Sequence, residues 1–128
     1  MGKKSARSDS PTTSAEKVAI YETTAPLLTA MRDELRELAK KKPEATLNKN
    51  KVHIINRLLT DVKAVLEDES DSKYLDLLDE EMLPQYSDVV LILSQFAASM
   101  TRFFDRYCPF VENEGDILHR GEHRWSIS

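Results

Sequence analysis

Two histidines and two carboxylates near the C-terminal end of the chain are the side chains best spaced for chemistry. Asp116, His119, Glu122 and His123 lie within eight residues, and on a helix the two histidines would share one face. Imidazole and carboxylate groups together can bind zinc or iron. A metal site needs three or four rigidly placed ligands, and the predicted helices offer no second cluster. We therefore predict no metal site within this chain, and a metal-dependent activity assembled with a partner chain remains an alternative.

The other reactive side chains stand alone in the sequence. No carboxylate can be placed beside His53, and Cys108, the only cysteine, lacks the local signature of a catalytic thiol. Residues 68–79 have the acidic spacing of a calcium loop, but Lys73 replaces its glycine and Asp79 its final glutamate. No glycine lies between residues 3 and 114, which excludes a glycine-rich phosphate loop there. These observations predict a non-enzymatic protein without a cofactor.

The charged residues are unevenly distributed along the chain. Residues 32–57 carry eight Lys or Arg against four Asp or Glu, whereas residues 61–88 carry two against ten. Lys and Arg neutralise phosphates, so the basic stretch predicts a nucleic-acid site formed by Lys40, Lys41, Lys42, Lys49, Lys51 and Arg57. The acidic isoelectric point of about 5.4 counts against this site, because nucleic-acid-binding domains are usually basic. A nucleic-acid-associated regulator is therefore our alternative hypothesis.

Three amphipathic helices are predicted to position these residues. Apolar residues recur at helical spacing over 14–42, 47–67 and 87–107, and a shorter helix is expected within 70–78. The helix over 87–107 is apolar nearly all round in its first half, which favours a central or interfacial position. We predict an all-α fold, a compact antiparallel bundle of three to five helices. A flexible N-terminal tail over 1–13 precedes the bundle domain over 14–108, and a conditionally ordered tail over 109–128 follows it.

The helix ends and one proline give more local predictions. The expected N-terminal caps are Thr13 in a capping box with Glu16, then Thr46 or Asn48, then Ser87. Pro26 interrupts the first helix and leaves two alternatives. Either the helix kinks there, or it ends near Glu22 and a second helix begins with Thr24 as its cap. We favour the break.

The sequence also favours a reducing compartment. One cysteine cannot form a disulfide within the chain, no apolar stretch follows the basic N-terminus, and no run reaches the roughly 18 apolar residues of a membrane span. We predict a cytoplasmic protein. The stretches 25–35, 48–59 and 74–96 are typical of a soluble bacterial protein, but they indicate no particular family.

The leading hypothesis is an accessory or regulatory subunit that acts through helix-mediated contacts with a protein partner or with itself. Aromatic residues and arginines are the usual anchors of protein interfaces. The candidates come from the C-terminal tail and the end of the last helix: Trp125, Arg120, Arg124, Phe103, Phe104 and Tyr107.

Overall fold

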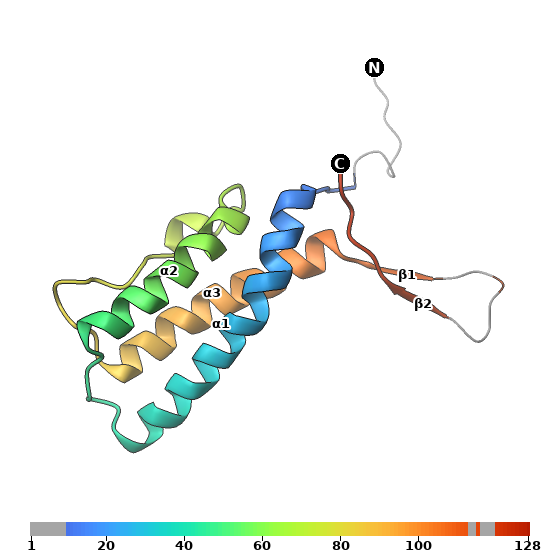
Figure 1. The fold of residues 1–128 in the computed structure, drawn as a ribbon. Helices are drawn as coiled ribbons and strands as arrows, with labels where there is room; N and C mark the ends of the chain where they lie inside the picture. Colours follow the sequence, from blue (N-terminus) through green and yellow to red (C-terminus); the bar gives the residue numbers. More distant parts are fainter. Residues whose placement is uncertain (1–9, 113–114, 116–119) are drawn as a thin grey trace.

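The structure is a computed structural model that describes residues 10–112, 115 and 120–128. Three helices pack against one another, and a two-stranded antiparallel sheet projects from one end (Figure 1). The elements are α1 (Ala15–Lys41), α2 (Lys49–Leu66), a 3₁₀ turn (Ser72–Tyr74), α3 (Tyr86–Tyr107), β1 (Phe110–Glu112) and β2 (Gly121–His123). The predicted bundle of three to five helices is confirmed at this level. The all-α prediction overstates the helical content, because the segment after α3 forms a hairpin.

Helix α1 is continuous through Pro26, so the favoured break at this residue is wrong. Pro26 and Glu22 are both exposed, and water can therefore bond the Glu22 carbonyl that lacks an amide partner. Thr24 and Leu28 are buried on either side of the proline, and this packing holds the helix together. The predicted Thr13 cap is also wrong, because the Ser14 hydroxyl accepts the hydrogen bond from the Lys17 amide at 3.1 Å.

Helix α2 has Asn48 as its N-cap, one of the two residues that the sequence predicted for this position. The Asn48 side chain caps the helix by accepting a hydrogen bond from the Lys51 amide at 2.8 Å. The apolar stripe of α2 supplies the centre of the core, with Val52, Leu59 and Val62 fully buried. A period of 3.6 residues explains this stripe directly.

The connection from α2 to α3 packs over these two helices, and the predicted short helix is reduced to one 3₁₀ turn. Its only regular element is the 3₁₀ turn, after which Leu75 and Leu78 are buried against the core. The buried Asn56 side chain exchanges two hydrogen bonds of 2.8 Å with the backbone of Leu78. These bonds give the Leu78 amide and carbonyl the partners that a helix would otherwise provide within its own backbone. They fix the connection at Leu78 in an extended form.

Helix α3 begins at Tyr86, and its N-cap residue is Gln85 without a side-chain hydrogen bond, so the predicted Ser87 cap is wrong. The backbone provides the support instead. The Tyr86 amide donates to the Ala45 carbonyl at 2.7 Å, which joins the two connections at this end of the bundle. One face of α3 is buried through Phe96 and Phe103, while Leu91 is 61% exposed. Helix α3 is therefore not covered on every side.

The C-terminal hairpin is fastened to the bundle by backbone pairing. Strands β1 and β2 pair antiparallel with Val111 opposite Glu122. Gly121 has φ of +155°, and a side chain there would place Cβ 2.2 Å from the Val111 carbonyl oxygen. Beyond β2 the chain returns to the start of α1, where the Thr13 amide donates to the Ser126 carbonyl at 2.8 Å. Thr13 is thereby used in a β-bridge rather than as a helix cap.

Within the described residues, no helix combines the length and the apolar character needed to cross a membrane.

Candidate functional site

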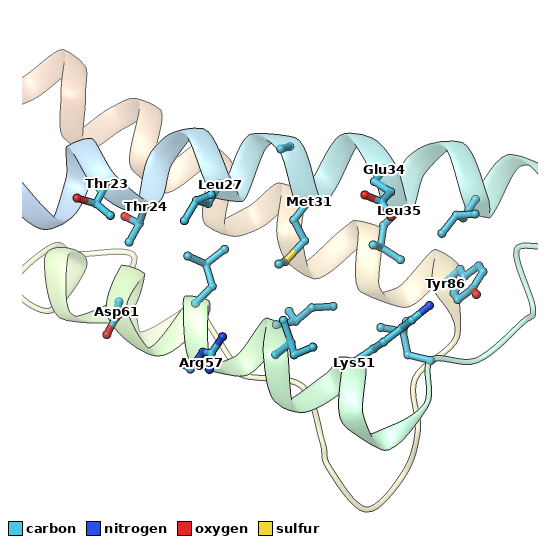
Figure 2. Close-up of a pocket in the computed structure, with 16 residues that line it drawn as sticks. Thr23, Thr24, Leu27, Met31, Glu34, Leu35, Lys51, Arg57, Asp61 and Tyr86 are labelled. Carbon is cyan, nitrogen blue, oxygen red and sulfur yellow. The ribbon is translucent and has the colours of Figure 1, made fainter.

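An open groove runs between α1 and α2, with a volume of about 540 Å³ (Figure 2). Its two walls come from helices that run in opposite directions, and Tyr86 at the start of α3 closes one end. Most of the lining is apolar: Leu27, Ala30, Met31, Leu35, Leu38, Leu47, Ile54, Ile55 and Leu58. An open apolar groove between helices is a common site for a protein or small-molecule ligand.

Adjacent apolar pairs explain how the helices supply both a core and a groove. Leu28 is buried in the core while its neighbour Leu27 lies in the groove wall and is 54% exposed. On α2, Ile55 is buried whereas Ile54 is 41% exposed at the groove. Successive helical residues differ in direction by about 100°, so each pair serves two faces. The groove therefore exposes large apolar side chains that the core does not use.

Four charged residues border the apolar lining. Glu34 of α1 and Lys51 of α2 stand at one end of the groove, and Arg57 and Asp61 of α2 stand toward the other (Figure 2). All four are exposed. Within the part of the chain that the structure describes, none of these side chains forms an ion pair or a hydrogen bond. The rim thus presents unpaired charges of both signs beside an apolar surface.

The α2–α3 side of the bundle differs, because the connecting chain covers it. Leu75 and Leu78 fill the space there, and Lys63 donates a further hydrogen bond to the Leu75 carbonyl. No described segment covers the α1–α2 groove in the same way (Figure 1). The groove is therefore an apolar surface between two helices that no described segment covers.

The predicted anchor Trp125 packs inside the molecule. Its ring lies 5.2 Å from Tyr21, 6.0 Å from Phe103 and 5.6 Å from Phe104, measured between centroids. Its indole N–H donates to the Glu22 carboxylate at 3.3 Å. Trp125 is half-buried and Phe103 is only 1% exposed. These aromatic residues hold the C-terminal segment against α1 and α3, and in this arrangement Phe103 cannot touch a partner.

Of the remaining predicted interface residues, Tyr107 joins the aromatic cluster, because its ring lies 4.8 Å from that of Phe103. The Tyr107 hydroxyl donates to the Glu69 carboxylate at 2.9 Å, and burial together with this bond raises the pKa of Tyr107 above 10.0. Arg124 pairs with Glu122 at 2.9 Å, and Arg120 is exposed. The structure therefore brings together Trp125, Phe103, Phe104 and Tyr107.

The six predicted cations divide into two groups. Lys51 and Arg57 line the groove together with Glu34 and Asp61, so the charge there is mixed. The others lie near the connection between α1 and α2, where Lys40 pairs with Glu37 of its own helix at 3.0 Å and where Lys41, Lys42 and Lys49 are exposed.

The acidic stretch after α2 makes contacts within the molecule. Asp68 accepts a hydrogen bond from Lys17 of α1 at 2.7 Å, and this bond raises the pKa of Lys17 above 10.5. Asp71 accepts a hydrogen bond from Ser99 of α3 at 2.7 Å and lies 3.4 Å from Arg102. Part of the acidic surplus thus joins the connection to the first and third helices.

The predicted metal-ligand candidates are only partly described. Asp116 and His119 lie outside the described residues, and the His123 imidazole bonds the Cys108 carbonyl at 2.9 Å. Among the described residues, no group of three or more His, Cys, Asp or Glu side chains could hold a metal ion. Cys108 is 3% exposed, and burial raises the pKa of its thiol above 9.0. That thiol is therefore mostly protonated at neutral pH.

No family model matches the chain, and its comparison with curated proteins and with solved structures gave no match.

Sequence reasoning named Lys51 and Arg57 but did not single out the apolar residues of the groove, although a signal for them was present. The pairs Leu27–Leu28, Ile54–Ile55 and Leu58–Leu59 each place two large apolar residues side by side. Such pairs widen the apolar stripe beyond one contact face. The width of the apolar stripe indicates a second contact face on each helix. Only the fold shows that no described segment covers this face.

Proposed function

We propose that this chain is a non-enzymatic interaction protein that binds a helix of a protein chain in the α1–α2 groove. The observation that supports this function best is the exposure of Leu27 and Ile54 beside unpaired rim charges. Burying large apolar side chains is the main source of free energy in protein association. Opposite charges around such a surface then select the partner and its orientation.

The dimensions of the groove suit a helical partner. From Thr24 to Leu38 the α1 wall extends about 21 Å at the usual rise of a helix. A partner helix of about four turns would fill this length, with apolar residues every three or four positions facing the groove. Binding of a partner helix in this groove supports an accessory or regulatory role for the chain.

Nucleic-acid binding receives less support from the same residues. Two of the six predicted cations stand beside Glu34 and Asp61, which would repel a phosphate backbone approaching the groove. Protein interaction is therefore the proposed function, and nucleic-acid binding through the basic residues is the alternative.

Site-specific photo-crosslinking in the source cell tests this function. A photoreactive amino acid replaces Ile54 in the groove, and the control replaces Leu91, which is 61% exposed on α3 and does not line the groove. We expect a covalent adduct with a polypeptide from position 54 and little or none from position 91. Equal adducts from both positions, or none from position 54, would contradict the proposal.

A further inference from the structure

We infer that the partner in the groove is a second copy of this chain, so that α1 and α2 of two copies form one four-helix bundle. This inference rests on the proposed function and names its partner. Each copy already supplies two antiparallel helices, which is half of such a bundle. Helix α3 and the C-terminal hairpin of each copy would remain on the outside.

The spacing of the groove residues fits this assembly. Residues facing the groove recur at Leu27, Met31, Glu34 and Leu38 on α1 and at Lys51, Ile54, Leu58 and Asp61 on α2. Both series alternate between steps of three and four, the pattern with which helices of a four-helix bundle interdigitate. Each wall of the groove is therefore patterned for one further helix, and two walls call for two such helices.

The charges on the rim make the face complementary to itself. A two-fold axis parallel to the helices would set α1 of one copy beside α2 of the other at the same level along the bundle. Glu34 and Lys51 stand at the same end of the groove (Figure 2). Glu34 of each copy would then meet Lys51 of the second copy, which gives both unpaired charges a partner.

The same arrangement matches the apolar and polar parts of the two walls. Because α1 and α2 are antiparallel, Met31, three residues before Glu34, shares its level with Ile54, three residues after Lys51, so Met31 would face Ile54 of the second copy and both side chains would leave water on assembly. At the far end, Asp61 would lie beside Thr24 of the second copy, whose level along the groove it shares (Figure 2). A second copy thus covers the apolar lining of both walls and gives Glu34 and Lys51 a partner of opposite charge.

The first experiment is the absolute mass of the full chain by light scattering after size exclusion. The protein is studied from about 5 to about 500 µM, because interfaces of modest size dissociate in the micromolar range. We expect a mass approaching twice 14.6 kDa at the high end. Ile54→Lys should weaken the dimer at least about tenfold, since both copies carry the change. The matched control Leu91→Lys should leave the dimer unchanged, and circular dichroism verifies that both variants are folded.

A charge exchange tests the geometry with exposed residues that the fold does not need. Glu34→Lys and Lys51→Glu should each weaken the dimer about three- to tenfold, because each breaks two symmetry-related pairs. The double variant should restore most of the affinity. Failure of the double variant to recover any affinity would overturn the proposed pairing.

The outcomes separate this inference from the proposed function. A monomer at every concentration overturns the second copy as partner. If Ile54 then still crosslinks to a different polypeptide, the groove keeps its proposed function. If Ile54 forms no adduct either, both fail. A dimer that Leu91→Lys disrupts and Ile54→Lys does not would likewise overturn the inference.

Discussion

Asn56 is the side chain that keeps the α2–α3 face closed, and its replacement by alanine should be costly. Its side chain is 6% exposed and makes two hydrogen bonds of 2.8 Å with the amide and carbonyl of Leu78. In Asn56→Ala both backbone groups lose their partner. Each unsatisfied buried group costs about 1–3 kcal/mol, so the loss of two partners should lower the free energy of unfolding by about 2–6 kcal/mol.

The connection could escape that penalty only by leaving the core. Leu78 is 4% exposed and Leu75 is 3% exposed, so both would then enter water. Exposing one buried leucine costs about 1.5–3 kcal/mol, and the total is similar by either route. With a urea slope of about 2 kcal/mol per M, the middle of the usual range, the midpoint of unfolding should drop by about 1–3 M.

Urea denaturation of the full chain measures this effect, and Asn48→Ala is the matched control. Asn48 caps the same helix at an exposed position, where its loss should cost about 1 kcal/mol. Amide hydrogen exchange adds a local readout, because the Leu78 amide should lose protection only in Asn56→Ala. The reasoning is refuted if Asn56→Ala is no less stable than Asn48→Ala, or if the Leu78 amide stays protected.

Three further perturbations follow from the structure. Pro26→Ala should raise the free energy of unfolding by about 1–3 kcal/mol in urea denaturation, because the exposed proline lacks a helical hydrogen bond; a decrease would contradict this. Gly121→Ala should abolish hydrogen-exchange protection in the hairpin while α2 keeps its protection, since its Cβ would lie 2.2 Å from the Val111 carbonyl oxygen; an intact hairpin would count against the structure. Burial raises the pKa of Cys108 above 9.0 and of Tyr107 above 10.0, so the folded chain binds these protons more tightly than the unfolded chain does. Stability should therefore be fully present below pH 9 and fall as the pH rises through these raised values, with a shallower fall in Tyr107→Phe; urea midpoints that stay constant up to pH 11 would exclude this linkage.

The main helices could be predicted because their signals are local. In α2 the apolar stripe and Asn48 act within one segment, and the structure reproduces them. The break at Pro26 was wrong because the sequence does not reveal that the proline lies on an exposed face. The expected short helix within 70–78 is reduced to the 3₁₀ turn Ser72–Tyr74, because Asn56, a residue distant in sequence, offers the backbone of Leu78 a different set of hydrogen bonds. Tertiary contacts here outweigh local helix preference.

The hairpin and the groove depend even more on distant contacts. Strands of three residues, such as Phe110–Glu112, are too short to show an alternating pattern. Trp125 was predicted as an anchor for a partner, and its aromatic contacts are with the chain's own Tyr21 and Phe104. The groove residues carry a visible excess of apolar character. Whether that excess is exposed depends on where the α2–α3 connection packs, which no local pattern records.

Contacts between two copies across the groove test the central claim most directly. Mixed samples of chains with different isotope labels allow nuclear Overhauser effects between copies to be separated from those within a copy. At high concentration, we predict cross-peaks between the Met31 methyl of one copy and the Ile54 methyls of another. A concentrated sample without such cross-peaks, or with intermolecular cross-peaks from Leu91 in their place, would contradict the account.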